Sequence, residues 1–565
     1  MIRKAALIAT LALLALALTL TAPAQGPTPT KDAQAGEAVI TAELLRAHTT
    51  FLSDDLLEGR APASRGGALA AKYIAAQFER MGLLPGGENG TYFQDVPMLA
   101  KKIEPPADLA VSGNGQTLTF KFVDEFLAGS DLEQERVDVS GELVFVGYGI
   151  TAPEFNWDDF KGADVKGKIL LMVVNDPPAT AAEPTLFGAK ALTYYGRWTY
   201  KYESAARRGA AGAILIHTTK SAGYPFQVLQ SGADREGFSL PRTPQSDPPL
   251  ALKSWVNHES AEKIFTLAGK DLAALIEAAQ RRDFRPVPLG VRASTGFRQT
   301  MRQISMPNVI GLLPGADEML RDEYVVYTAH YDHLGVGREV NGDGIYNGAA
   351  DNAVGVAGLL GIAEGMARIS SGLKRSQVFA AVAAEESGLL GSAYYAQNPT
   401  FPLAQTTATI NIDGLNTIGA TRDMVLIGDG KSELDEVARI VARERRLQLR
   451  PDQFPEQGFF YRSDQFSLAK VGVPALYFDP GLEIEGKPEG YGKQKFDEYV
   501  AHDYHQPSDE IKPDWDWQGA VQMARYLYGV GWKIANWERS FEWSSTAEFR
   551  AAREESLRKA GRLKK

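Results

Sequence analysis

From residue 306 to residue 537 the sequence alternates short apolar segments with segments of helical periodicity, and this pattern constrains the fold most strongly. The segments 324–329, 377–384, 408–412 and 473–478 are rich in apolar and β-branched residues, as is typical of buried strands. Apolar residues recur at helical spacing in 352–366, 433–447 and 515–537. The alternation predicts an α/β fold: a three-layer α/β/α sandwich with a mixed sheet.

The region before this alternation contains a segment with a helical pattern and a segment rich in strand-like runs. Residues 40–81 predict two helices, which open an N-terminal part of the same domain at 40–134. Strand-like runs at 142–150, 168–174 and 213–217 surround a small-residue helix at 202–212, so a separate β-rich domain is expected at 135–292. The α/β domain is expected at 293–540, followed by a charged tail at 541–565.

The first 24 residues are typical of a cleaved secretory signal peptide. Arg3 and Lys4 precede an uncharged apolar run at 5–20, and Ala22-Pro23-Ala24 offers a cleavage site between small residues. The run is shorter than the roughly 20 residues of a spanning helix, and no later segment is long and apolar enough. The sequence therefore predicts an exported, periplasmic or extracellular protein without a membrane span, with a flexible lead-in at 25–39.

The charge and the cysteine count exclude several classes of function. The net charge of −10 argues against nucleic-acid binding, which needs a basic surface. The absence of cysteine excludes disulfides, thiol nucleophiles, iron–sulfur clusters and thiolate zinc sites. Any transition-metal site must use the seven histidines and the carboxylates.

Residues able to bind a metal follow the predicted strands. In α/β sheets ligands bind at the carboxyl ends of the strands, where these side chains should meet. They are His330, Asp332 and His333 after the first strand, Asp351 at a helix start, Glu385 and Glu386 after the second strand, Asp413 after the third, and Tyr504 and His505 before the last helix.

Imidazole and carboxylate ligands suit Zn²⁺ where thiolate is absent. Two histidines cannot complete two tetrahedral sites, so we expect Asp351 to bridge two ions. Asp332 is placed to accept the second ring N–H of His330. Of the neighbours Glu385 and Glu386, one can ligate while the other acts as a general base.

Six motifs carry a resemblance to a known family. They lie at 330–335, 344–357, 384–392, 412–414, 462–464 and 504–509. On these motifs, segments 40–130 and 293–535 resemble the co-catalytic dizinc aminopeptidases, a family that includes glutamate carboxypeptidases, the transferrin receptor ectodomain and glutaminyl cyclases. Segment 135–292 resembles a protease-associated domain, on the motifs at 147–150, 155–160, 165–169 and 206–214.

The resemblance implies roles for individual residues. His330, Asp351 and Asp413 would hold one zinc, and Asp351, Glu386 and His505 the other. Glu385 would be the general base, Tyr504 would bind the oxyanion, and Arg462 and Asp464 would contact the substrate. The implied function is an exported aminopeptidase with two zinc ions that acts on the N-terminus of a peptide or protein.

The sequence departs from the family pattern at two places. Gln465 stands where a histidine is frequent, so no ligand is expected there, and Ala350 replaces a frequent acid. The additional histidines His333 and His502 are expected to be surface or packing residues, and support of a metal ligand is the less favoured alternative for His333.

Three alternatives stay open at this point. A carboxypeptidase or dipeptidase needs a cationic pocket for the terminal carboxylate, which Arg462 alone does not supply. A glutaminyl cyclase would use one zinc. A non-catalytic, receptor-like binding protein would have lost ligands, whereas all five candidates and Glu385 are present.

Overall fold

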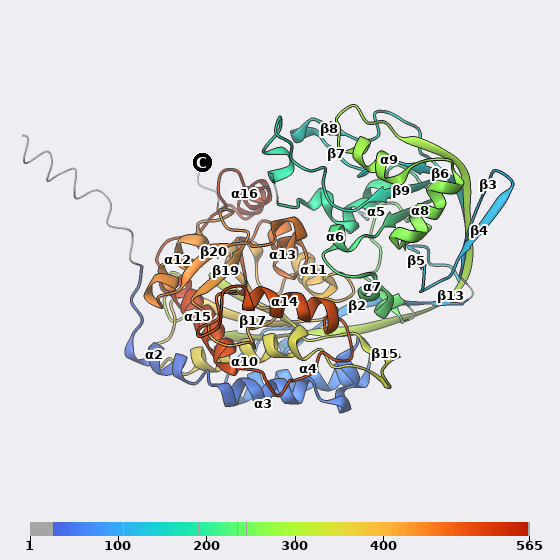
Figure 1. Ribbon diagram of the computed structural model, residues 1–565. Coiled ribbons are helices and arrows are strands. Elements are labelled where there is room, and N and C mark those ends of the chain that lie inside the picture. The colour runs from blue at the N-terminus through green and yellow to red at the C-terminus, as the bar shows by residue number, and fades with distance from the viewer. Residues whose placement is uncertain (1–25, 106, 190, 234, 245, 563–565) are drawn as a thin grey trace, which may run out of the picture.

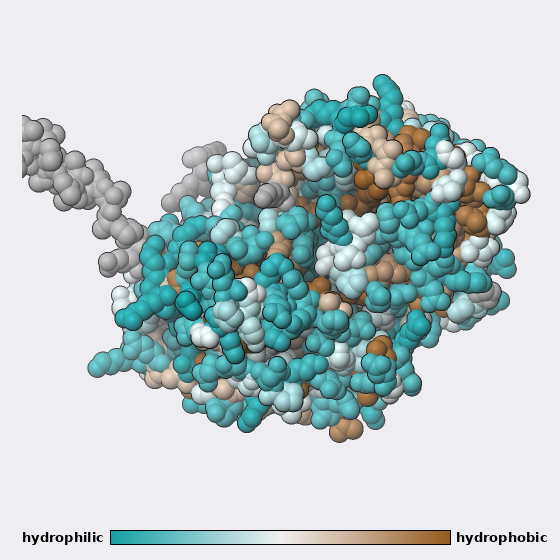
Figure 2. Space-filling view, in the orientation of Figure 1, coloured by the Kyte–Doolittle hydropathy of each residue, from teal (hydrophilic) through white to brown (hydrophobic). Residues whose placement is uncertain are grey.

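The computed structural model describes residues 26–562, except positions 106, 190, 234 and 245 (Figure 1). The predicted signal peptide at 1–24 lies outside the described residues. Within the described part of the chain, no helix has the length and apolar character to cross a membrane. The face in Figure 2 is largely hydrophilic, and its hydrophobic residues gather mainly at the upper right.

The larger half of the molecule is built on a mixed sheet. Four parallel strands form its centre, and antiparallel strands flank them on both sides. The order is β13 (Val287–Leu313), β17 (Ser376–Val382), β14 (Tyr324–His330), β18 (Thr406–Asn411), β21 (Ala475–Pro480), β19 (Asp423–Ile427) and β20 (Gln448–Pro451). Strands β17, β14 and β18 are buried along almost their whole length, which explains their continuous apolar sequences.

Helices cover both faces of this sheet (Figure 1). One layer contains α3 (Ala42–Leu52), α4 (Arg65–Arg80), α10 (Val354–Ala367), α12 (Leu434–Glu444) and α15 (Trp517–Asn536). The other contains α11 (Leu390–Gln397) and α13 (Gln465–Lys470), which pack over Val326, Val378 and Val473. The predicted three-layer α/β/α sandwich is confirmed, and each strand and helix predicted between 306 and 537 is present.

Strand β13 joins the two halves of the molecule. It is 27 residues long, which corresponds to about 90 Å of extended chain. Its second half pairs with β2 (Phe93–Glu104) and β17, while its first half pairs with β3 (Leu109–Gly113) and β6 (Arg136–Phe145). The sequence did not predict this strand, and the expected boundary between 292 and 293 falls inside it.

The smaller half, which we call the insert unit (residues 107–297), has its own core. Strands β6, β9 (Ile169–Val173), β10 (Gly212–Ile216) and β12 (Leu252–Val256) are parallel, and β5 (Phe126–Gly129) pairs antiparallel to β12. Because Leu109 and Phe120 belong to this core, the unit begins before the expected boundary at 135. Its resemblance to a protease-associated domain stays a prediction.

Helices α5 (Trp198–Arg207), α8 (His258–Leu267) and α9 (Leu272–Ala279) belong to the insert unit. The charged C-terminal segment forms helix α16 (Arg550–Lys559). The remaining strands and α-helices are β1 (Leu84–Pro85), β4 (Gln116–Phe120), β7 (Thr151–Ala152), β8 (Trp157–Asp158), β11 (Gly237–Ser239), β15 (Gly335–Val340), β16 (Asp343–Tyr346), α6 (Thr219–Ala222), α7 (Phe226–Ala233) and α14 (Tyr491–His502).

The prediction of a flexible lead-in at 25–39 is wrong, because this segment forms helix α2 (Lys31–Ala38). The helix packs on α10, where Ala33 and Gly36 are buried. A Cβ atom at position 36 would lie 2.3 Å from the carbonyl oxygen of Gly365, so glycine allows this close approach. Tyr528 donates a 2.8 Å hydrogen bond to the carbonyl of Ala33 and fixes the helix on the core.

Buried His48 makes stability depend on pH. Its side chain is 5% exposed, Nδ1 lies 2.8 Å from the Tyr73 hydroxyl, and burial lowers its pKa from the usual 6.5 to about 4. The folded state therefore resists a proton that the unfolded state accepts, so stability is lost as pH falls from 6.5 toward 4. We expect His48→Gln, which keeps a polar partner for Tyr73, to lessen the fall in the unfolding midpoint over this range.

The measurement is thermal unfolding of the metal-free protein followed by circular dichroism between pH 7 and pH 4. The control is His258→Gln, because His258 is about half exposed. Parallel pH curves for the wild type and His48→Gln would contradict the prediction.

Candidate metal centre

The topology brings the predicted ligands to one edge of the sheet. Strands β14, β17 and β18 are parallel, so their carboxyl ends meet there. His330 ends β14, Glu385 and Glu386 follow β17, and Asp413 follows β18. Asp351 lies in the turn Ala349–Ala353 before α10, and His505 lies in the loop after α14.

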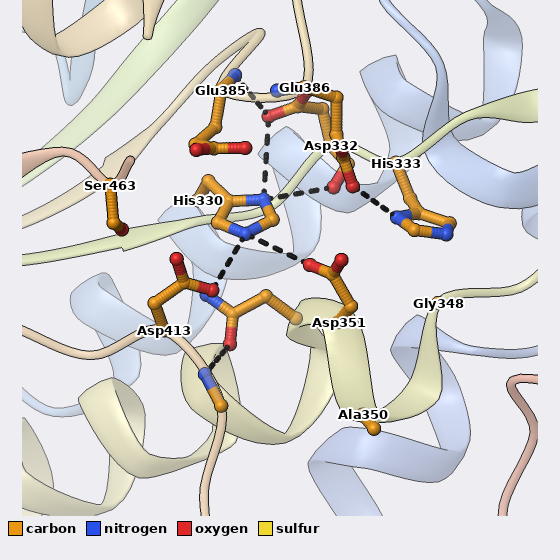
Figure 3. Close-up of polar contacts among 12 residues, drawn as sticks. His330, Asp332, His333, Gly348, Ala350, Asp351, Glu385, Glu386, Asp413 and Ser463 are labelled. Carbon is orange, nitrogen blue, oxygen red and sulfur yellow. Dashed lines mark hydrogen bonds and ion pairs between the residues drawn. The ribbon is translucent and has the colours of Figure 1, made fainter. Parts of the chain in front are cut away.

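Asp351 lies between the two histidines. The Nε2 atom of His330 is 3.2 Å from Asp351 Oδ1 and 3.2 Å from Asp413 Oδ1 (Figure 3). The Nε2 atom of His505 is 3.3 Å from Asp351 Oδ2 and 2.9 Å from Glu386 Oε2. Each carboxylate oxygen of Asp351 thus faces a different imidazole, which is the arrangement expected of a bridging ligand. All five predicted ligands come together.

The donor atoms fit a metal. Among the described residues, buried Nε2 of His505 has no hydrogen-bond partner, although two carboxylate oxygens lie within 3.3 Å. One ligand atom each from His330, Asp351 and Glu386 lies within 4.8 Å of the others. Nitrogen and oxygen donors that converge without hydrogen-bond geometry suit a cation, and imidazole with carboxylate suits zinc.

The site concentrates negative charge. Burial raises the pKa of Glu385 well above its usual value; Glu386 and Asp413 add to this effect, while His330 opposes it. Burial and Asp351 would also raise the pKa of Glu386, but His505 and His333 outweigh them and lower it to about 2. Burial lowers the pKa of His505, but Glu386 and Asp351 raise it to about 10. A bound cation would relieve this repulsion between carboxylates.

Glu385 and Tyr504 lie beside the ligands, as predicted. The Glu385 carboxylate makes no dashed contact with the residues drawn in Figure 3. The rings of Tyr504 and His505 are 4.0 Å apart between centroids, and the nearby Tyr504 side chain raises the pKa of Arg462 against the effect of burial. Both Glu385 and Tyr504 line open space next to the ligands, so both can reach a bound substrate.

Asp332 orients the site differently from the prediction. The Nδ1 atom of His330 is 3.3 Å from the Asp332 backbone carbonyl and 3.9 Å from its carboxylate. The carboxylate instead accepts hydrogen bonds from the backbone N–H groups of Glu385 (3.1 Å) and Glu386 (3.4 Å). Burial raises the pKa of Asp332 to about 7. This residue thus holds His330 and both glutamates in place.

The structure favours the second of the two roles weighed for His333, the support of a ligand, over a surface or packing position. This residue is 1% exposed, and its Nδ1 atom is 2.6 Å from Glu386 Oε1, so it fixes a predicted ligand. His502 is exposed on α14, as expected.

Arg462 lines the open space beside the ligands, whereas Asp464 is fully buried and lines neither of the cavities described below. Substrate contact by Asp464 stays a prediction.

Asp509 supports the bridging ligand and was missed as a functional residue. Its carboxylate accepts hydrogen bonds from the backbone N–H groups of Ala350 (2.9 Å) and Asp351 (3.0 Å). Asn352 adds a second tie, because its side chain accepts from Gly414 N (2.7 Å) and donates to Ile412 O (3.0 Å). The only signal for Asp509 was its place at the end of the motif at 504–509.

Arg60 is the second missed residue. Its buried guanidinium donates to the carbonyls of Tyr331 (2.8 Å), Asn347 (2.5 Å), Gly348 (3.0 Å) and Leu52. Burial lowers its pKa to about 10, while Asp332 and Asp509 oppose that shift. One side chain from the loop between α3 and α4 thus ties together the segments that carry His330 and Asp351. A single arginine in a loop gives no sequence signal for this role.

Two cavities meet at the metal centre. The first, of about 390 Å³, is lined by acidic and aromatic side chains that include Asp452, Asp479, Phe454 and Tyr477. The second, of about 530 Å³, lies between the larger half of the molecule and the insert unit. Both are lined by Tyr224, Glu385, Arg462 and Tyr504, so these residues stand at their junction. A ligand that extends through the junction would pass the predicted general base.

An α/β/α sandwich that gathers two histidines and three carboxylates at the carboxyl edge of its sheet has the architecture of a metal-dependent hydrolase. Residues 308–530 match the sequence model of peptidase family M28, and this segment contains all five predicted ligands and Glu385. This part of the chain is therefore similar to peptidase family M28.

Several solved structures are similar over most of the chain. The aminopeptidase from Aneurinibacillus sp. strain AM-1 is 19% identical with a TM-score of 0.52, over 89% of this chain and 96% of that chain. BSAP, a zinc aminopeptidase from Bacillus subtilis, is 18% identical with a TM-score of 0.46, over 90% and 97%. A peptidase M28 precursor from Shewanella amazonensis SB2B is 17% identical with a TM-score of 0.47, over 91% and 99%. The first of these likenesses shows a shared fold.

The contacts of Asp509 predict that Asp509→Asn weakens zinc binding. The amide would place an N–H₂ group where the carboxylate accepts two backbone N–H groups, and Asp351 would lose its orientation. We expect zinc affinity to fall about tenfold or more, as for other residues that orient ligands. Competition with a chromogenic chelator measures it. Asp497→Asn, on exposed α14, is the control, and unchanged affinity in a folded Asp509→Asn protein would contradict the prediction.

Proposed function

We propose that this chain is an exported aminopeptidase that uses two zinc ions to hydrolyse N-terminal peptide bonds. The observation that carries the proposal is the position of Asp351, with one oxygen toward His330 and the other toward His505, beside Glu385. The match of residues 308–530 to the model of peptidase family M28 and the likeness in fold to the aminopeptidase from Aneurinibacillus sp. strain AM-1 support it. Export rests on the sequence pattern at 1–24.

Two sets of residues would hold the metals. His330, Asp351 and Asp413 would hold one zinc, and Asp351, Glu386 and His505 the other. Bound zinc would lower the pKa of a water molecule and polarise the scissile carbonyl.

The side chains at the junction of the cavities supply the remaining chemistry. Glu385 would take a proton from the attacking water and pass it to the leaving amine. Tyr504 would donate a hydrogen bond to the carbonyl oxygen as negative charge develops on it. Arg462, which lies near Tyr504, would hold that phenol in position. His333 and Asp332 would keep the two glutamates apart in their different roles.

The first cavity favours exopeptidase action at the amino end. Asp413 and Glu385 line it close to the centre, and Asp452 and Asp479 line it as well. A free α-ammonium group is attracted to such a wall, whereas an N-blocked peptide gains nothing from it. The aromatic side chains of the same cavity suit the side chain of the first residue.

Two of the three alternatives, the glutaminyl cyclase and the receptor-like binding protein, have less support. A glutaminyl cyclase would use one zinc, whereas the two imidazoles on opposite oxygens of Asp351 favour two ions. A receptor-like binding protein would not require Glu385 beside an intact set of ligands.

Glu385→Gln tests the general base. The substitution keeps the shape of the side chain and leaves the ligand set intact, so zinc content should stay at the wild-type level. We expect kcat on leucine p-nitroanilide to fall by roughly 10²–10⁴-fold, the usual contribution of a general base. The control is Glu339→Gln, at an exposed position of β15. Activity close to the wild-type value with normal zinc content would remove Glu385 from this role.

Zinc content and blocked substrates test the rest of the proposal. We expect two zinc ions per chain by atomic emission, loss of activity on chelation, and recovery when zinc is returned. N-acetyl-leucine p-nitroanilide should not be cleaved, because it lacks the ammonium group. Full activity with one zinc, or cleavage of blocked substrates alone, would contradict an aminopeptidase with two zinc ions.

A further inference from the structure

The first cavity holds more acidic groups than the amino end of a peptide requires. Asp413 and Glu385 line it next to the metal centre, where they can meet an α-ammonium group. Two further acids, Asp479 and Asp452, line the same cavity. Asp479 lies in β21, and Asp452 directly follows β20. These two carboxylates are therefore available to a second positive group on the same substrate.

The order of the strands places these acids relative to the metal centre. Along the sheet, β18 is followed by β21, then β19, then β20. Asn411 of β18 pairs with Tyr477 of the parallel strand β21, and Asp413 and Asp479 each follow that pair by two residues. Asp452 belongs to a strand still farther along the sheet. The acids of this cavity therefore lead away from the metal ligands, from Asp413 toward Asp479 and Asp452.

No cation of the described residues neutralises the two outer acids. Neither Asp479 nor Asp452 forms an ion pair with a lysine or arginine in the described part of the chain. The two lysines that line the cavity, Lys495 and Lys512, pair with other acids at 2.9 Å and 3.3 Å. The cavity therefore offers negative charge that a ligand can use.

The carboxylate of Asp479 shows what it costs to bring these acids together. Burial raises its pKa to about 7, and neighbouring Asp452 and Asp413 add to this effect. Tyr477 and Arg462 oppose the shift without cancelling it. Burial raises the pKa of Asp452 as well. A cation placed between the two carboxylates would favour their charged forms and offset their repulsion.

An aromatic wall accompanies the two acids. The backbone N–H of Phe454 donates a 2.8 Å hydrogen bond to Asp452 Oδ1. The ring of Phe454 stacks on the ring of Phe496, with 5.1 Å between centroids, and both residues line the cavity. Aromatic rings pack against the methylene stem of a lysine or arginine and attract its charged head. Acids beside aromatic rings thus suit a long basic side chain better than a short or purely apolar one.

We propose that Asp479 and Asp452 form a subsite for the basic side chain of the first residue of the substrate. The inference rests on the proposed function and names its substrate class: peptides whose free amino terminus is lysine or arginine. The α-ammonium group would meet Asp413 and Glu385, and the cation at the end of the side chain would reach the two outer acids. A carboxylate accepts paired hydrogen bonds from a guanidinium and attracts an ammonium group as a point charge.

Neutral substrates of the same shape test the subsite. Arginine p-nitroanilide is compared with the citrulline compound, and lysine p-nitroanilide with the 6-hydroxynorleucine compound. In at least one pair, wild-type kcat/KM for the basic substrate should exceed that for its neutral partner by about tenfold or more, the usual effect of hydrogen bonds to a charged group. In Asp479→Asn that ratio should fall to about one, and Asp479→Glu should recover part of it. Asp452→Asn should lower the ratio too, and it keeps the test if Asp479→Asn does not fold.

The control is Asp497→Asn, because Asp497 pairs with Lys493 and lines neither cavity. It should keep the wild-type ratios. A preference confined to one pair supports the subsite and names the side chain that it takes. Equal wild-type rates within both pairs, or wild-type ratios in both Asp479→Asn and Asp452→Asn, would overturn the subsite.

Binding without turnover separates this inference from the proposed function. We would titrate argininamide, lysinamide and their two neutral partners into zinc-loaded Glu385→Gln and Glu385→Gln/Asp479→Asn by calorimetry. The double variant should bind the preferred basic amide about tenfold more weakly and its neutral partner with unchanged Kd. This result in a protein without peptidase activity would retain the subsite and reject the function. Equal Kd values in the two variants, or no binding of any of the four amides, would reject the subsite whatever the activity.

Discussion

The carboxylate of Asp351 is the contact on which the site depends, because it lies between two imidazoles that come from distant parts of the chain. His330 ends a central strand, while His505 follows helix α14 near the C-terminal end. Neither histidine is near the other in sequence, and only the shared carboxylate relates them. A chain without cysteine can assemble a zinc-type site in this way, from two nitrogen donors and a majority of oxygen donors.

Holding so many carboxylates together requires a supporting layer, which the structure supplies mostly through backbone groups. Asp509 accepts from the N–H of Asp351, Asp332 accepts from the N–H groups of the two glutamates, and Arg60 donates to carbonyls on both sides of the centre. Such contacts fix the ligand segments rather than the ligand side chains. A motif search does not find these contacts, because the partner atoms are backbone N–H and C=O groups, which do not depend on the identity of the side chain.

The insert unit is joined to the peptidase half by β13, one strand shared by two sheet regions and two cores. That continuity places the start of α5 across from the metal centre, so Arg197 and Tyr224 enter the wall of the second cavity. The insert unit thereby belongs to the surroundings of the site.

The sequence by itself determined the sandwich and the five candidate ligands, because buried strands and helices leave periodic apolar patterns and the ligands stand directly at strand ends. It could not determine which groups meet across long separations. The expected surface position of His333, the flexible lead-in before α3 and the domain boundaries at 135 and 293 all changed in the structure. Only the tertiary structure placed the ring of Tyr224 against the guanidinium of Arg462, because contact between residues so far apart in the sequence depends on how two packed units face each other.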